Sequence, residues 1–491
     1  MSSLSPIHFI LPPEVMEKIF IAALVSDLDN LSIHFDPDFS PYQPYMVPRI
    51  SSTTVPLLLL RVCKIWREIA LGTRPLFTKI FLYGRLKVDP WKVIPMWLDR
   101  SGSLPLDVVI QPELWSPTGP LTTANERDKV RALLDLLCNN LHRIRTLRMG
   151  EFGGSLLPSS NPELQLQTLE ELTITDAEPA TDPEIYDLCS IYAPELRTLQ
   201  ILRSRFDLSW NMHINQFYPG GNLRVFRNSS FPQTLDDLGH LLGFNPLLEI
   251  CNVTQWETTQ ESWEYLENAR IHLPCLRQLI LSTPSNSENA FQVFCRFINC
   301  LDIPGQLEDL FLGYPPTSTL TMDDWYDDEE NSRSSVARLI RRNSYVLKCL
   351  SLVGTPDVLF LNSLALTCLQ TLTLASSRGL FSMPVAHHFF PQLSILHLYD
   401  LQIGKGMGHG RHLLRFLISK THPESTYSGE NVALQEVILD HCEGVCPEEQ
   451  ECINELSKRR DHVSWDIQWP VSLDPDPVQP ITMSIHTEEA V

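Results

Sequence analysis

The chain has 491 residues, of which 43% are hydrophobic and 20% are charged, so it is long enough for two or more domains and too apolar to be disordered throughout. Its formal net charge of −21 argues against nonspecific binding to nucleic acid or to an anionic membrane. No secretory leader follows Met1, and the apolar run at 55–60 is too short to span a bilayer. The twelve cysteines form no regular framework. We therefore expect a protein of the cytosol or nucleus with reduced thiols.

The first predicted element is an amphipathic helix that begins at Pro12 and Pro13. Proline suits a first helical turn because its missing N–H would be unpaired there, and Glu14 adds a negative charge that favours the helix dipole. The apolar residues recur three or four positions apart in one broad stripe, made of Val15, Met16, Ile19, Phe20 and Ala22 or Ala23.

A second amphipathic helix is predicted from Pro56 to Ala70. Its apolar residues are again three or four positions apart, namely Leu59, Val62, Cys63, Trp66, Ile69 and Ala70. Two short helices cannot bury this much apolar surface on each other, so the remainder must contact either a partner or the following domain. The spacing alone does not choose between these two possibilities.

Two strings in these helices resemble an F-box, the small helical module that docks a protein onto the adaptor subunit of a cullin–RING ubiquitin ligase. LPPEVMEKIF at 11–20 is similar to the opening of that module, and VCKIWREIA at 62–70 is similar to its continuation. The segments 75–77 and 97–110 are similar to later parts of many fungal F-box proteins. The resemblance implies an adaptor interface drawn from eight residues, some of which must instead form the module's own core: Leu11, Pro12, Ile19, Phe20, Leu59, Val62, Cys63 and Trp66.

Residues 27–55 separate the two helices, where an F-box has only a short link. Four prolines, Pro37, Pro41, Pro44 and Pro48, predict a loop in this insert. Such a loop could fold over the adaptor-binding face and block docking. We therefore expect an F-box-like domain at 1–76 that carries a loop insert at 27–55.

One apolar pattern recurs from residue 144 onward: an apolar residue, two variable residues, an apolar residue, one variable residue and a third apolar residue. Successive copies start 22 to 41 residues apart, mostly near the period of leucine-rich repeats. The last two apolar residues of a copy alternate with a variable one, as in a strand with one buried face. The eleven copies begin at Ile144, Leu169, Leu196, Leu223, Leu248, Leu276, Leu307, Leu347, Leu369, Leu393 and Leu434.

These copies are similar to the degenerate leucine-rich repeats of F-box proteins and predict an α/β solenoid at 77–470, a horseshoe lined by parallel strands. Segments 77–84 and 104–110 are expected to supply its first two strands and 462–470 its last, with helices at 127–140 and 336–342 between copies. Glycine-rich 404–430 is interpreted as a flexible loop, and acidic 323–330 as a solvated loop or, alternatively, a site for a basic peptide. Residues 471–491 predict a disordered tail.

The most site-like group of metal-ligating residues is His441, Cys442, Cys446 and Cys452. Zinc needs ligands that converge tetrahedrally, and no second pair of ligands lies at finger spacing, so we interpret Cys442 as a core residue of its repeat. No P-loop, dinucleotide fingerprint, nucleophile elbow or HExxH motif occurs. The sequence therefore predicts no metal, no cofactor, no catalytic residue and no enzyme.

The resemblance implies a substrate-recognition subunit of an SCF-type ubiquitin ligase. Its F-box would bind the adaptor and, through it, a cullin, while its repeats would bind a protein target that the residues do not identify. One alternative is an F-box scaffold that never joins a cullin. Another is a ligand-binding receptor or an enzyme that uses the concave face, which a well-formed pocket with convergent polar groups would favour. Neither nucleic acid nor a membrane is expected as a partner.

Overall fold

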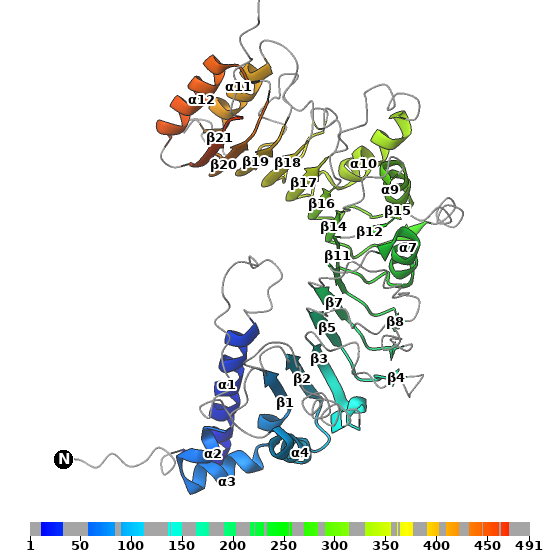
Figure 1. Ribbon diagram of the computed structural model, residues 1–491, viewed down its shortest axis with the longest axis vertical. Coiled ribbons are helices and arrows are strands. Elements are labelled where there is room, and N and C mark those ends of the chain that lie inside the picture. Colours follow the sequence, from blue (N-terminus) through cyan, green and yellow to red (C-terminus); the bar gives the residue numbers. More distant parts are fainter. Residues whose placement is uncertain are drawn as a thin grey trace, which may run out of the picture. The chain divides into compact units, whose positions relative to one another are not determined.

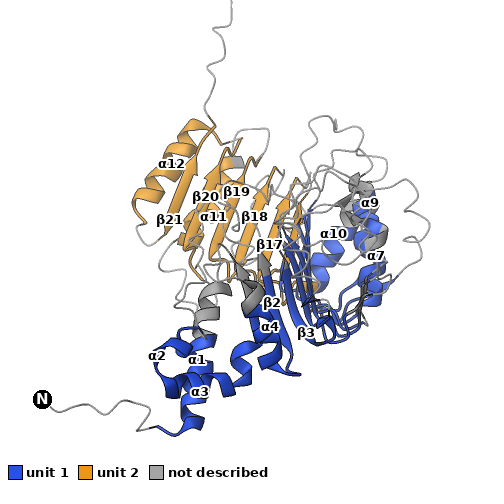
Figure 2. Ribbon diagram, turned by 60° about the horizontal axis from the view of Figure 1, so that its bottom comes forward, with its two compact units in different colours: residues 1–309, 320–342 blue, residues 310–319, 343–491 orange. Residues whose placement is uncertain are grey.

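The computed structural model describes residues 11–32, 57–83, 90–111, 136–149 without 138, 164–175, 191–202, 217–229 without 220, 233–257 without 255, 270–282, 290–313, 329–354, 361–376 without 362–363, 390–401, 409–421, 432–460 without 444, and 463–470. The chain forms two compact units, coloured separately in Figure 2. Unit 1 comprises residues 1–309 and 320–342, and unit 2 comprises residues 310–319 and 343–491. The expected boundary at residue 76 does not separate these units and stays a prediction.

Unit 1 begins with three helices and a 3-10 turn, α1 (Pro13–Ser32), α2 (Leu59–Val62), α3 (Lys64–Gly72) and η3 (Arg74–Phe77), shown in blue in Figure 1. The prediction of one helix from 56 to 70 is wrong, because Cys63 is extended (φ −157°, ψ 174°) and separates α2 from α3. The loop predicted at 27–55 also needs correction, because α1 continues to Ser32. Residues 33–56 lie outside the described part of the chain.

The repeats of unit 1 form a parallel sheet in which neighbouring strands follow the order of the chain. Most of these strands alternate buried and half-exposed residues, as Leu279 and Leu281 do with their neighbours on β14. The strands are β1 (Lys79–Tyr83), β2 (Leu106–Gln111), β3 (Ile144–Met149), β5 (Glu171–Thr175), β7 (Thr198–Leu202), β9 (Val225–Asn228), β11 (Ile250–Val253) and β14 (Gln278–Ser282).

Short strands and helices complete the repeats of unit 1. The short strands pair in parallel as β4 (Leu164–Gln165), β6 (Ile191–Ala193) and β8 (Phe217–Pro219), as β10 (Gln233–Thr234) with β12 (Trp256–Glu257), and as β13 (Ile271–His272) with β15 (Leu301–Asp302). The helices are α4 (Pro90–Ser101), η5 (Leu141–Arg143), α7 (Leu235–Phe244), α9 (Ala290–Cys300) and α10 (Glu329–Asn343, of which 329–342 belong to this unit). The last confirms the helix predicted at 336–342 and begins inside the acidic segment 323–330, whose other residues lie outside the described ones.

Unit 2 repeats the same parallel arrangement. Its strands are β16 (Asp309–Gly313, of which 310–313 belong to this unit), β17 (Cys349–Val353), β18 (Thr371–Ala375), β19 (Ile395–Tyr399), β20 (Glu436–Asp440) and β21 (Ser464–Gln468), and its helices are α11 (His409–Thr421) and α12 (Pro447–Lys458). The interpretation of 404–430 as a loop is wrong over 409–421, because α11 buries Leu413, Phe416 and Leu417.

Four consecutive strands of unit 2 end in the same turn. The residue after each of β17 to β20 has a positive φ between 46° and 68°, and these residues are Gly354, Ser376, Asp400 and His441. The backbone N–H of each donates to the carbonyl of the last residue of the following repeat's strand, at 2.7 to 2.9 Å. The turn therefore extends the ladder between strands by one hydrogen bond before the chain leaves the sheet.

All eleven predicted copies contain a strand, and the strands expected at 77–84, 104–110 and 462–470 are also present. The predicted α/β class with parallel strands is confirmed. Of the helix predicted at 127–140, only 136–137 and 139–140 belong to the described residues, and 136–137 are helical. The tail predicted at 471–491 lies outside them. In the part of the chain that the structure describes, no helix is long and apolar enough to cross a membrane.

Candidate docking surface

Five exposed apolar side chains on the N-terminal helices form the candidate docking surface. They are 38% to 51% exposed and comprise Val15, Ile19, Leu58, Val62 and Ile65. Among the described residues nine large apolar side chains are exposed, so more than half of them belong to this small helical module. Val15 and Ile19 are one turn apart on α1, and Leu58, the N-cap of α2, lies four residues before Val62.

The same helices also have a buried core of their own. Met16, Phe20 and Leu24 follow each other at intervals of four residues on α1 and are almost fully buried. The ring of Phe20 lies 5.1 Å from the ring of Trp66 on α3, centroid to centroid. The broad stripe predicted for α1 is therefore two stripes, one that packs against α3 and η3 and one that faces solvent.

The eight residues predicted for the adaptor interface fall into three groups. Pro12, Ile19 and Val62 are exposed, Phe20 and Leu59 are buried, and Leu11, Cys63 and Trp66 are half-buried. Sequence reasoning did not select the other exposed residues as interface positions. The helical period could have found them, because Val15 and Leu58 lie four residues before Ile19 and Val62, and Ile65 lies three after Val62.

The break between α2 and α3 is held by specific hydrogen bonds. The Sγ atom of Cys63 accepts a hydrogen bond from the backbone N–H of Trp66 at 3.4 Å and so caps α3. The Nε of Arg67 donates to the carbonyl of Leu60 at 2.8 Å, across the break. These bonds fix the direction of α2, which carries the exposed Val62.

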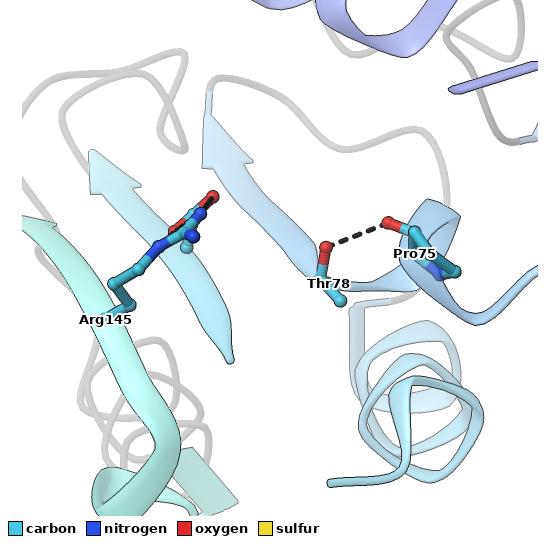
Figure 3. A network of polar contacts seen from close by, with 4 residues as sticks. Pro75, Thr78 and Arg145 are labelled. Carbon is cyan, nitrogen blue, oxygen red and sulfur yellow. Dashed lines mark hydrogen bonds and ion pairs between the residues drawn. The ribbon is translucent and has the colours of Figure 1, made fainter. Parts of the chain in front are cut away.

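The helical module joins the sheet through a small polar network. The hydroxyl of Thr78 donates to the carbonyl of Pro75 at 2.8 Å and closes η3 just before β1 (Figure 3). The carbonyl of Thr78 accepts from the N–H of Asp107 at 2.9 Å. Arg145 holds the Asp107 carboxylate through Nη2 at 2.8 Å, and this hydrogen bond raises the pKa of Arg145.

A buried arginine ties α4 to the third strand of unit 1. The Nη2 atom of Arg143 donates to the carbonyl of Leu98 at 3.0 Å and to the hydroxyl of Ser101 at 2.8 Å. Burial lowers the pKa of this guanidinium. Since Phe77 also contacts Trp97 of α4, at 6.4 Å between ring centroids, the helical module rests on the first strands through aromatic and polar contacts together.

The described residues contain no group of three or more His, Cys, Asp or Glu side chains that could hold a metal ion. Cys442 is fully buried, which confirms it as a core residue, and burial raises the pKa of its thiol to about 12. A thiol with so high a pKa is a poor nucleophile at neutral pH. Cys446 is the N-cap of α12, and Cys452 is exposed.

By its own fold the chain is a leucine-rich-repeat-like α/β protein with helices at its N-terminal end. No model of a known protein family matches it, and no curated protein does. Among solved structures it is similar to an internalin from Listeria monocytogenes, with 14% identity, a TM-score of 0.37, and coverage of 70% of this chain and 89% of that one. A TM-score of this size is too low to support an inference about function.

Proposed function

We propose that the chain is the substrate-recognition subunit of an SCF-type ubiquitin ligase. Its N-terminal helices would bind the adaptor subunit, its repeats would bind a protein target, and other subunits would supply the chemistry. The observation that carries the proposal is a small helical module whose core is complete without its five exposed apolar side chains. Side chains that folding does not need, gathered on one small module, are typical of an interaction site.

The sequence match and the burial pattern support the proposal independently. The strings at 11–20 and 62–70 resemble the two halves of an F-box, in the right order. The exposed residues within or beside those strings include Pro12, Ile19 and Val62, which the resemblance had selected. In this proposal Val15, Leu58 and Ile65 join them at the interface.

The buried residues of the module have a different role in this proposal. Phe20 and Leu59 hold α1 and α2 in place and do not touch the adaptor. Leu11, Cys63 and Trp66 are half-buried and border the contact. Truncation of a residue at the centre of a protein interface typically costs about 2 kcal/mol or more of binding free energy, which is more than tenfold in affinity.

The repeats provide the second binding region of the proposal. The variable positions on the strands are half-exposed in most copies, as the pattern of β18 shows, so neighbouring copies present rows of side chains to a partner. Such a chain needs no cofactor, and it would be located in the cytosol or nucleus. Through the adaptor it would meet a cullin.

The proposal is tested by co-purification of the full chain with the adaptor subunit. Ile19→Ser combined with Val62→Ser should lower adaptor affinity more than tenfold and leave the circular dichroism spectrum unchanged, because both side chains are exposed. The matched control is Phe244→Ser combined with Ile418→Ser, which removes exposed apolar side chains elsewhere in the chain and should leave adaptor binding intact. An unmodified chain that does not bind the adaptor, or a double variant that binds it as well as the unmodified chain, would contradict the proposal.

A second measurement separates a ligase subunit from a scaffold. If the chain bound to the adaptor also co-purifies with a cullin, it is assembled as a ligase subunit. If the adaptor binds and the cullin is excluded, the scaffold alternative is correct.

A further inference from the structure

Five outward-facing residues of unit 1 form a continuous polar row across its sheet. They lie in register on the adjacent strands β3, β5, β7, β9 and β11 and are Arg148, Thr173, Gln200, Arg227 and Asn252. Their neighbours along each strand are core residues such as Leu172 and Ile174, so the row faces away from the leucine core. We call these five residues the polar row.

The polar row contains three polar atoms that have lost contact with solvent and have no hydrogen-bond partner. They are Oγ1 of Thr173, Nε of Arg227 and Oδ1 of Asn252. Thr173 is only 2% exposed. Buried polar groups are nearly always paired, because an unpaired one loses its hydrogen bonds to water without replacement. Three of the nine such side-chain atoms found among the described residues lie in this one row, which makes the row a candidate contact for a polar partner.

The charges in the polar row are also unbalanced. Arg148 is neutralised by Glu171, since its Nη2 lies 2.8 Å from Oε1 of that carboxylate. Arg227 forms no ion pair with any of the described residues. The Nε of Arg227 is shielded from solvent, and within the described part of the chain no ion pair neutralises its charge, so a carboxylate from a partner could do so.

We propose that the polar row binds an extended segment of a protein partner and that a carboxylate side chain of this segment pairs with Arg227. A guanidinium presents Nε and Nη in a planar fork that matches the two oxygens of a carboxylate. On binding, the side chains of the row reorient, so that the hydroxyl of Thr173 and the amides of Gln200 and Asn252 bond the backbone of the segment. This inference rests on the proposed function, because it names the chemistry of the target that the repeats would select.

The charge balance favours a carboxylate over a phosphate group. A carboxylate carries one negative charge, which Arg227 alone can neutralise. A phosphate monoester carries nearly two near neutral pH and needs further cations. The other arginine of the row, Arg148, is already neutralised by Glu171.

The test is a selection of random 12-residue peptides displayed on phage, with the immobilised full chain as bait and Arg227→Gln as counter-bait. Peptides that depend on Arg227 should be enriched in Asp or Glu. The strongest of them, made synthetically, should bind the unmodified chain at least tenfold more tightly than it binds R227Q. Replacing its acidic residue by Gln should cause the same loss on the unmodified chain and little further loss on R227Q, which identifies the two groups as partners.

Two further variants separate binding from folding. Arg224→Gln is the matched control, because Arg224 precedes the same strand and is paired with Glu249 at 3.0 Å, and it should leave peptide affinity unchanged. Thr173→Val removes an unpaired hydroxyl, so it should lower peptide affinity two- to tenfold without lowering the stability of the free chain.

Several results would overturn the inference. Recovery of no Arg227-dependent peptide would do so, as would recovered peptides without acidic enrichment, or tighter binding when phosphoserine replaces the acidic residue. These measurements use no adaptor. Failure of the adaptor experiment therefore leaves this result standing, and failure here leaves adaptor docking standing.

Discussion

Replacement of Gly410 by alanine should destabilise unit 2, although alanine is the better helix former. Gly410 is the second residue of α11, and glycine to alanine in a helix normally stabilises by up to about 1 kcal/mol. An added Cβ at this position would lie 2.0 Å from Oε2 and 2.8 Å from Cδ of Glu449. These distances are far inside van der Waals contact, so the Glu449 carboxylate would have to move.

Glu449 cannot move without losing interactions. It is 6% exposed, and its Oε2 accepts a hydrogen bond from the backbone N–H of Cys446 at 3.1 Å, which is half of the capping box of α12. Loss of a helix cap costs about 0.5–2 kcal/mol, and a hydrogen bond to a charged group contributes about 1.5–3 kcal/mol. These two losses overlap and exceed the helical gain, so we expect a net destabilisation of about 1–3 kcal/mol.

The assay is hydrogen exchange of the full chain, with peptides that cover α11 and the start of α12. Protection should fall in both segments of Gly410→Ala. The matched control is Gly243→Ala in α7, where an added Cβ meets nothing within 4 Å, and this variant should keep or gain stability. If Gly410→Ala is as stable as the unmodified chain and protection at the start of α12 is unchanged, the reasoning is refuted.

Three further predictions concern buried groups. Phe20→Ala should destabilise the N-terminal helices by about 3–5 kcal/mol, because the ring is 1% exposed and packs on Trp66. Ile19→Ala should change their stability by no more than about 0.5 kcal/mol, because Ile19 is exposed. Hydrogen exchange of α1 and α3 measures both changes. Burial lowers the pKa of Lys420 to about 8 from its ordinary 10.5, so between these values the unfolded chain binds more protons and stability should rise with pH. Urea unfolding at pH 7.5 and 9.5 should show this rise relative to Lys420→Met, and equal pH dependence in both would contradict it. Arg143→Met should lower protection in α4 by about 1–3 kcal/mol, because the buried hydroxyl of Ser101 loses its donor and the carbonyl of Leu98 loses one of its donors. Unchanged exchange in α4 would count against this.

The repeat strands were predictable because the apolar spacing within each copy indicates which of its residues are buried. On β18, for example, Leu372 and Leu374 are buried and the residues beside them are not. Parallel pairing in register then repeats this face from copy to copy, so local periodicity and tertiary packing agree.

Helix α11 was not predictable in the same way. Four glycines between 404 and 410 indicated a flexible loop, since glycine weakens helices. Gly410 is instead required by the approach of Glu449, which is 39 positions further along the chain and which no local pattern reveals. Tertiary contact, and not flexibility, explains this glycine.

The candidate docking surface was predictable in its location and not in its detail. The apolar stripe of α1 is broad enough to face two ways, and the side that became buried was decided by Trp66 and η3. The break at Cys63 also escaped the helical period, because the apolar spacing continues through it. Propensity and period describe one helix at a time, whereas exposure is a property of the assembled module.

The repeated left-handed turn at the strand ends of unit 2 marks where this array could be engineered. One of the four turns already has glycine, at Gly354, while Ser376, Asp400 and His441 hold a backbone conformation that costs a side-chain-bearing residue about 1–2 kcal/mol. Glycine at these three places would remove that cost, but ordering a glycine on folding costs about 0.5–1 kcal/mol more chain entropy. Each exchange therefore leaves a net gain between zero and about 1.5 kcal/mol. The turns also share one hydrogen-bonding geometry, which makes them natural junctions at which a repeat could be duplicated or removed with matching ends.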